Sequence, residues 1–141
     1  MRRIAATAVI AIALTVGLAG PASAGVWGTL ENHTDFQFTA TRFNTGSSTS
    51  CVTWNQDGTD QWRPYTWGDC QRYSIGAHTT TGTWFDTDGF RPNYGQSGYW
   101  VKFNSGSWKW IGINYFTTIE DDQTARCYQD TTGVVNCTVT G

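Results

Sequence analysis

The stretch Cys51–Cys70, CVTWNQDGTDQWRPYTWGDC, places two cysteines around a turn signal and a group of large side chains. Asp57-Gly58 is typical of tight hairpin turns, and the residues that flank the turn include β-branched and aromatic types, which favour strands. Pro64 interrupts the return segment Trp62–Trp67. Because proline has no amide to donate to a ladder, this segment should form a sheet edge or leave the sheet locally. We therefore predict a disulfide-stapled hairpin.

The first residues have the features of a secretory signal peptide. Arg2-Arg3 precedes an apolar run from Ile4 to about Leu18, and Ala22-Ser23-Ala24 is a small-residue cleavage pattern. The apolar run is too short to be a comfortable membrane span. We expect residues 1–24 to be the signal peptide and residues 25–141 to form a single secreted domain.

The charge of the expected mature chain argues against a nucleic-acid partner. Loss of the two signal arginines leaves 9 − 2 = 7 Lys and Arg residues against 11 Asp and Glu residues, a net charge of −4. Phosphate binding needs a basic surface, and no basic stripe is present. We predict that the protein does not bind nucleic acid.

The four cysteines all lie in the expected mature chain. An even number of cysteines in an oxidising compartment predicts two disulfides, for which three connectivities are possible. We predict Cys51–Cys70 and Cys127–Cys137, because each pair closes one expected hairpin and cross-strand neighbours lie within disulfide reach.

Residue types and alternation predict an all-β domain. All 21 aromatic residues lie in the mature chain, whereas Leu30 is its sole leucine, and Trp, Phe, Tyr, Val and Thr favour strands. Phe36, Phe38 and Ala40 alternate with polar residues, as in a strand with one buried face. The expected strands lie at 36–41, 51–54, 62–67, 71–78, 83–85, 99–103, 108–116, 125–129 and 134–139.

These segments predict an antiparallel β-sandwich or partly open barrel of about nine short strands with two disulfides. The stretch Asp86–Gly98 is expected to be the longest irregular segment, since it contains three glycines and a proline after Asp88. In the segment 108–116, Ile111, Ile113 and Tyr115 should share one face, and Trp108 and Trp110 the other.

Catalytic and metal-binding patterns are weak. Ser97 lies in a turn that is one residue short of a nucleophile elbow, and His33 and His78 are far apart in the sequence. The carboxylates of 120–122 and 86–89 could in principle serve glycoside hydrolysis or calcium binding. Carboxylates on polar turns are usually solvated, however, and the further ligands of a calcium loop are missing. We predict a non-enzymatic protein without a cofactor or metal.

Aromatic surface is the feature that most suggests binding. Eight tryptophans exceed what one small core easily encloses. Four large side chains of the stapled hairpin cannot all point inward from one strand, and Trp, Tyr and Arg are the types that dominate interface hot spots. We predict that the binding residues are Trp62, Arg63, Tyr65 and Trp67, and that the partner is an extracellular protein or a glycan.

The hairpin resembles a known inhibitor family. Ser50-Cys51-Val52-Thr53, Gln56, Trp62-Arg63 with Tyr65, and Gly68-Asp69-Cys70 are similar to the first disulfide hairpin of the secreted α-amylase inhibitors of the tendamistat type. In that family a Trp-Arg-Tyr triplet at a stapled turn enters the amylase active-site cleft. The resemblance implies that Trp62, Arg63 and Tyr65 inhibit an extracellular glycosidase, and this is the function that we expect first from the sequence.

A second resemblance extends over the whole chain. Asn32-His-Thr34, Asp88-Gly89-Phe90, 97–101 (SGYWV) and 110–115 (WIGINY) are similar in order to membrane-binding β-sandwiches of the aegerolysin and actinoporin kind. This resemblance implies binding to a lipid surface through exposed aromatic residues such as Trp100 or Trp108. A third hypothesis needs no family: exposed Trp and Tyr on a sheet could stack on sugar rings, as in a carbohydrate-binding module.

Overall fold

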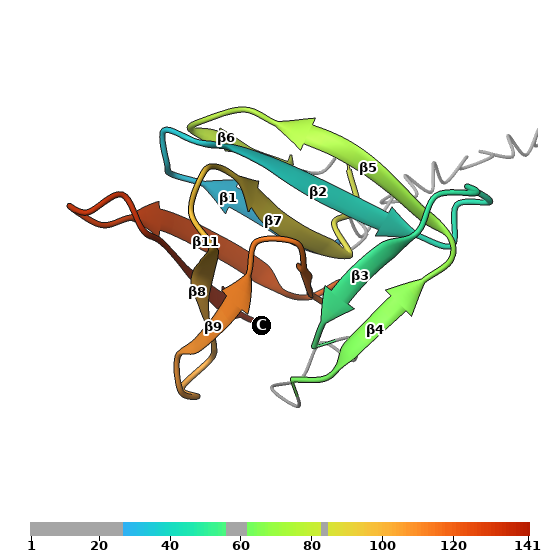
Figure 1. Cartoon of the computed structure of the whole chain (residues 1–141). Coiled ribbons are helices and arrows are strands. Elements are labelled where there is room, and N and C mark those ends of the chain that lie inside the picture. The colour runs from blue at the N-terminus through green and yellow to red at the C-terminus, as the bar shows by residue number, and fades with distance from the viewer. Residues whose placement is uncertain (1–26, 56–61, 83–84) are drawn as a thin grey trace, which may run out of the picture.

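Two six-stranded sheets pack against each other in the computed structural model of the chain, which describes residues 27–55, 62–82 and 85–141 (Figure 1). The expected signal peptide and the Asp57-Gly58 turn lie outside the described residues. Within those residues, no helix has the length and hydrophobicity needed to cross a bilayer.

One of the two sheets, sheet A, contains both strands of the last hairpin of the chain. Its strands, in spatial order, are β6 (Thr79–Thr80), β1 (Thr29–Asn32), β11 (Thr124–Gln129), β12 (Val135–Thr140), β8 (Gly98–Phe103) and β9 (Lys109–Gly112). The strands alternate between side chains that face the core and side chains that face outward, so β8 buries Tyr99, Val101 and Phe103 and exposes Trp100.

Sheet B contains the stapled hairpin at one edge. Its strands, in spatial order, are β4 (Pro64–Trp67), β3 (Cys51–Trp54), β10 (Phe116–Thr118), β7 (Gly89–Asn93), β2 (Gln37–Phe43) and β5 (Cys70–Ile75). The prediction that Pro64 belongs to an edge strand is confirmed, since β4 pairs with β3 alone among the described strands. An edge position tolerates the missing amide.

A buried tyrosine ties the two sheets together. Tyr99 of β8 is fully buried. Its hydroxyl lies 2.8 Å from Oγ1 of Thr117, a residue of β10 in sheet B, and 3.0 Å from the carbonyl oxygen of Tyr115, which directly precedes β10. The ring packs near Phe90 in the common core. Since a buried hydroxyl is costly without partners, these bonds fix how the sheets face each other.

The all-β sandwich with two disulfides is confirmed, but the expected antiparallel arrangement is wrong in part. Three pairings among the described strands are parallel: β1 with β11, β3 with β10, and β8 with β12. They arise because the chain repeatedly crosses from one sheet to the other, so that neighbours in a sheet are often distant in sequence. The described residues form twelve strands, more than the nine expected.

Several strand boundaries also differ from the predictions. The stretch Asp86–Gly98 contains β7, in which Pro92 is tolerated because the β10 ladder reaches only Phe90, leaving that side of the strand unpaired. Segment 108–116 divides into β9 and β10, which belong to different sheets. The segment 71–78 ends as a strand at Ile75. Of the expected strand 83–85, residues 83–84 lie outside the described residues, and Phe85 is buried but not in a strand.

Both predicted disulfides are present, in different settings. Cys127 and Cys137 are direct cross-strand partners in β11 and β12. The Cys51–Cys70 disulfide does not close the β3–β4 hairpin, as the sequence had predicted. It joins β3 to β5, the second and sixth strands of sheet B, and the Cα atoms of the two cysteines lie 5.8 Å apart. The amide of Cys70 also donates to the carbonyl of Thr49. Sheet B is therefore curled, and the disulfide joins its two sides.

Candidate functional site

The predicted hairpin residues are separated by a change in backbone conformation. Trp62 has a φ of 30°, outside the strand region, and its ring packs edge-on to Phe103 of sheet A with centroids 5.7 Å apart. Trp62 is thus a partly buried residue against the sandwich core. Arg63 is exposed, and its carbonyl accepts a hydrogen bond from the amide of Asn55.

Tyr65 and Trp67 lie together on one face of β4. Trp67 stacks on Phe43 with centroids 4.6 Å apart, and Tyr65 meets Trp67 edge-on at 5.3 Å. Tyr65 remains 47% exposed. The structure therefore brings Tyr65 and Trp67 together on the surface of the hairpin, while Trp62 of the predicted set packs into the sandwich.

A second group of aromatic residues lies on the outward face of sheet A. The ladder aligns Trp110 of β9 with Trp100 of β8, Trp100 with Asn136 of β12, and Asn136 with Tyr128 of β11. In-register residues on neighbouring strands point to the same face. Trp100, Trp110 and Tyr128 are 38%, 43% and 50% exposed. We call Trp110, Trp100, Asn136 and Tyr128 the aromatic row.

Neighbouring groups hold the rings of the aromatic row in place. Trp110 lies against Gly98, where an added Cβ would be only 2.7 Å from the indole ring, so the glycine permits the close approach. Trp100 meets Trp110 edge-on at 5.3 Å. At the other end, Tyr128 stacks on His33 at 4.6 Å with the planes nearly parallel. His33 thus covers one face of the Tyr128 ring, the Trp100 and Trp110 rings are inclined to each other by 66°, and all three rings remain partly open to solvent.

A shallow hollow adjoins the aromatic row. It has a volume of about 320 Å³ and is lined by Trp100, Trp108 and Asn136. This volume is at the lower end of the range of about 300–1,000 Å³ for ligand pockets. Lys102 lies over the Trp108 ring, 5.1 Å from its centroid. The hollow therefore combines two indoles with an amide that both donates and accepts hydrogen bonds.

The charged groups beside the aromatic row have partners within the protein. Arg126 Nε donates to Glu31 Oε2 over 3.0 Å, and Arg126 also donates to the hydroxyl of Thr140. Lys102 lies over the Trp108 ring and keeps its positive charge. The arrangement offers ring faces and neutral hydrogen-bonding groups more than free charge, which suits an uncharged polar ligand.

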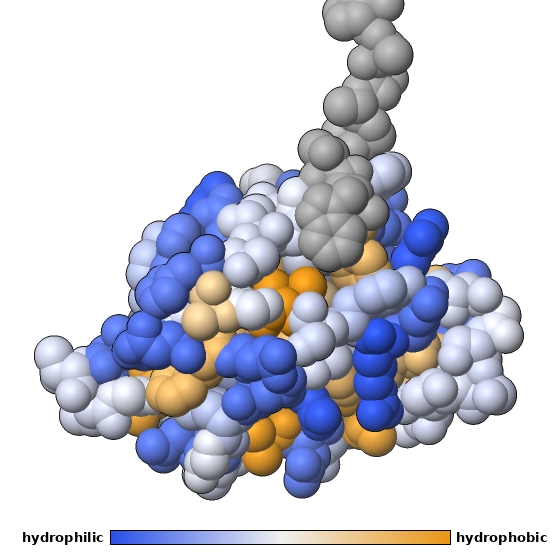
Figure 2. All heavy atoms as spheres, turned by 90° about the horizontal axis from the view of Figure 1, so that it is seen from above, coloured by the Kyte–Doolittle hydropathy of each residue, from blue (hydrophilic) through white to orange (hydrophobic). Residues whose placement is uncertain are grey.

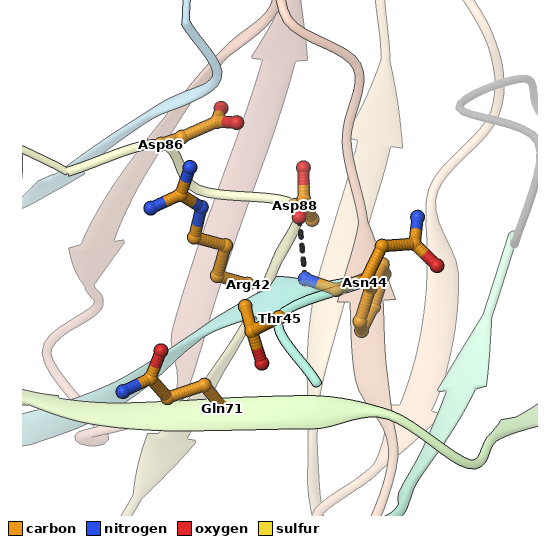
Figure 3. Close-up of a pocket in the computed structure, with 7 residues that line it drawn as sticks. Arg42, Asn44, Thr45, Gln71, Asp86 and Asp88 are labelled. Atoms are coloured by element: carbon orange, nitrogen blue, oxygen red, sulfur yellow. Dashed lines mark hydrogen bonds between the residues drawn. The ribbon is translucent and has the colours of Figure 1, made fainter. Parts of the chain in front are cut away.

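An acidic pocket lies elsewhere, where β2 leaves sheet B. It has a volume of about 450 Å³, and Figure 3 shows the Arg42 side chain reaching up beside Asp86, with Asp88 nearby. Oxygens of Asp86, Asp88 and Asp121 lie within 4.8 Å of one another and could each offer one ligand to a cation. Three carboxylates fall short of the six to eight oxygens that Ca²⁺ takes, without further donors.

Asp88 has the most perturbed carboxyl of this pocket. Burial, with the nearby Asp86 and Asp121 charges, raises its pKa to about 6 from 3.8, although Oδ2 accepts a hydrogen bond of 2.6 Å from the Phe43 amide. Between pH 4 and 6 the folded protein therefore holds a proton that the unfolded chain has lost. The stability contributed by this proton is complete below about pH 4 and is lost as the pH rises through 6.

Asp88→Asn should therefore remove this pH dependence. The oxygen of the asparagine side chain still accepts a hydrogen bond from the Phe43 amide, but the asparagine carries no charge. We therefore expect the free energy of unfolding to rise by about 1–2 kcal/mol at pH 7.5, after allowance for solvent screening, and to change little at pH 4. Urea unfolding at both pH values measures the difference. Asp69→Asn is a control for which we expect the opposite effect. Hydrogen bonds from Gly46, Ser47 and Thr45 lower the pKa of Asp69, so loss of this carboxylate should destabilise the folded protein at neutral pH. Equal gains at both pH values would contradict the assignment.

Comparison with protein-family models, with curated proteins and with solved structures finds no match for this chain. The site must therefore be interpreted from its own geometry. Sequence alternation had already placed Trp108 and Trp110 on one face. It missed the alignment with Trp100 and Tyr128, because Tyr99-Trp100-Val101 is apolar throughout and the sequence therefore gives no sign that Trp100 alone of the three is exposed.

Proposed function

We propose that this protein is a secreted, non-catalytic carbohydrate-binding protein whose binding face is the aromatic row on sheet A. The observation that supports the proposal is the register of exposed rings across adjacent strands: Trp110, Trp100 and Tyr128 share one line, with Asn136 between the last two. Aromatic faces pack on the C–H surfaces of sugar rings, while amides and hydroxyls pair with sugar hydroxyls.

The spacing of the row fits an extended glycan that crosses the strands. Trp100 and Tyr128 lie two strands apart, and neighbouring strands are about 4.7–4.9 Å apart, so these residues are separated by roughly 9–10 Å. Such a spacing suits every second sugar of an extended β-1,4-linked chain. Because Arg126 pairs with Glu31 and the site otherwise offers one ammonium group, that of Lys102 over the Trp108 ring, the preferred ligand is a neutral polysaccharide.

A sedimentation assay tests this proposal. The purified mature protein is mixed with insoluble β-1,4-linked polysaccharides, with a branched α-linked polysaccharide and with liposomes of neutral and anionic composition. We expect retention on at least one neutral β-linked polysaccharide and none on liposomes. Sedimentation with liposomes alone would refute the proposal and favour the membrane-binding hypothesis.

The stapled hairpin supports a second candidate function, inhibition of an extracellular glycosidase of the α-amylase type. The observation in its favour is that Tyr65 is exposed yet held by Trp67, which itself stacks on Phe43. A side chain fixed before binding loses less conformational freedom on association. Arg63, also exposed, would meet a carboxylate of the enzyme's cleft.

If the hairpin inhibits an amylase, Arg63→Ala with Tyr65→Ala should abolish inhibition and leave the thermal midpoint nearly unchanged. Trp62→Ala should instead lower the thermal midpoint, because the Trp62 ring packs on Phe103. Reducing-sugar release by an α-amylase, titrated with each variant, measures inhibition. Inhibition that persists in the double variant, or its absence in the natural protein, would refute this candidate.

A further inference from the structure

The curled face of sheet B, which faces away from sheet A, carries a row of its own. Tyr65 of β4, Thr53 of β3 and Phe116 of β10 are in register across three neighbouring strands. Arg91 of β7, the next strand of the sheet, is in register with Thr39 of β2. Phe116 and Arg91 meet within this row, since the Arg91 guanidinium carbon lies 4.6 Å from the Phe116 ring centroid. Because the Cys51–Cys70 disulfide also packs on Phe116, the sheet curls around this face.

Two guanidinium groups share the ring of Phe116. The Arg72 guanidinium carbon lies 5.7 Å from the ring centroid, and that of Arg91 lies 4.6 Å from it. Arg72 is anchored by hydrogen bonds to the carbonyl of Ser50 and to the sulfur of Cys51. These bonds use two of its five N–H donors, so both arginines have donors to spare.

Arg91 lacks the partners that a half-buried cation normally has. Its Nε is buried without a hydrogen-bond partner. Neither Arg91 nor Arg72 forms an ion pair within the part of the chain that the structure describes. Burial, together with the neighbouring Arg72 charge, lowers the pKa of Arg91. Two like charges near each other with no counter-charge are costly, since buried charges in proteins are usually paired.

A second polar group on the same face is also unsatisfied. Thr41 pairs in register with Arg72, is fully buried, and has a hydroxyl without a hydrogen-bond partner. Unsatisfied buried polar groups are uncommon in native proteins, and a bound water or ion is one common explanation. The curled face thus has excess donors and positive charge, in a protein whose overall charge is negative.

We propose that Arg72 and Arg91 form a binding site for an oxyanion, the carboxylate or sulfate group of an acidic ligand. A guanidinium packed over a ring keeps its in-plane N–H groups available for a planar or tetrahedral oxyanion. Arg72 is exposed and Arg91 is partly exposed, so an anion from solvent would approach their accessible N–H groups, of which the buried Nε of Arg91 is not one. This site lies on the other sheet from the aromatic row and does not depend on glycan binding there.

Thermal unfolding at constant low ionic strength tests this site, with sodium sulfate, sodium glucuronate and sodium chloride as probes. We expect the thermal midpoint to rise and saturate with sulfate or glucuronate but not with chloride. Saturation distinguishes binding from the general stabilisation by sulfate, which increases steadily with concentration. The probe that saturates at the lower concentration identifies the preferred oxyanion.

Arg91→Met removes the charge and keeps an apolar side chain on Phe116. We expect its affinity for the preferred oxyanion to fall at least tenfold, with a thermal midpoint in the absence of anion equal to or above that of the natural protein. Arg91→Lys should retain part of the response. Arg126→Gln, which removes an equal charge from a paired arginine on sheet A, is the matched control and should respond normally.

Three results would overturn the proposal. The first is the absence of a saturable response in the natural protein. The second is a response that survives Arg91→Met. The third is a lower midpoint of Arg91→Met without anion, which would assign Arg91 to holding the fold through Phe116.

Discussion

Replacing Trp100 with alanine should weaken binding to the preferred polysaccharide by about thirtyfold or more. Trp100 stands at the centre of the aromatic row, contacts Trp110 and lines the hollow with Trp108. Central tryptophans are typical hot spots, which cost at least about 2 kcal/mol when truncated, and each 1.4 kcal/mol is about tenfold in affinity. Calorimetric titration with a soluble oligosaccharide measures the loss.

The matched control for Trp100 is a tryptophan on the other sheet. Trp67→Ala removes an equally large ring from the hairpin, where it stacks on Phe43, and should leave glycan affinity unchanged. Tyr128→Ala should have a smaller effect than Trp100→Ala, because Tyr128 lies at the end of the row. If Trp67→Ala abolished binding and Trp100→Ala did not, the binding face would have to be assigned to the hairpin.

Removing the Cys51–Cys70 disulfide by a double change to serine should destabilise the protein by about 3 kcal/mol. The cysteines are 19 residues apart, and both are buried with Phe116 in the small core of the curled sheet, against which the partly buried Phe43 packs. Serine there also buries hydroxyl groups in apolar surroundings. We expect a fall of roughly 10–15 °C in the thermal midpoint, measured by calorimetry.

The Cys127–Cys137 pair is the matched control for this change. It closes a shorter segment of 10 residues and joins β11 to β12, which already pair over six residues. Its removal should cost less, because the ladder still holds these strands together. A larger loss from the Cys127–Cys137 change would contradict the view that the first disulfide joins the two sides of sheet B.

Local patterns were sufficient to predict the class of the fold. Alternation and turn residues identified hairpins such as the one closed by Cys127 and Cys137, and the spacing of the cysteines gave both disulfides. The hairpin closed by Cys127 and Cys137 depends on residues close in sequence, where loop closure is short and register follows from the turn. The Cys51–Cys70 pairing was predicted as the closure of a hairpin, whereas this disulfide joins β3 to β5. The edge position of β4 likewise followed from Pro64 alone.

Features that depend on distant residues could not be predicted. The parallel pairing of β8 with β12 unites Trp100 with Asn136, and the pairing of β12 with β11 adds Tyr128. No local pattern specifies which strands become neighbours across such separations. The orientation of Trp62 was missed for another reason, since its positive φ interrupts the alternation of the hairpin.

Nuclear magnetic resonance of the tryptophan indole N–H groups during titration with a neutral β-1,4-linked oligosaccharide tests the central claim most directly. The signals are assigned by single tryptophan-to-phenylalanine changes. We predict that the indole signals of Trp100 and Trp110 shift with a common saturation curve while those of Trp62 and Trp67 stay in place. Saturating shifts confined to Trp62 or Trp67 would contradict the account and place binding on the stapled hairpin.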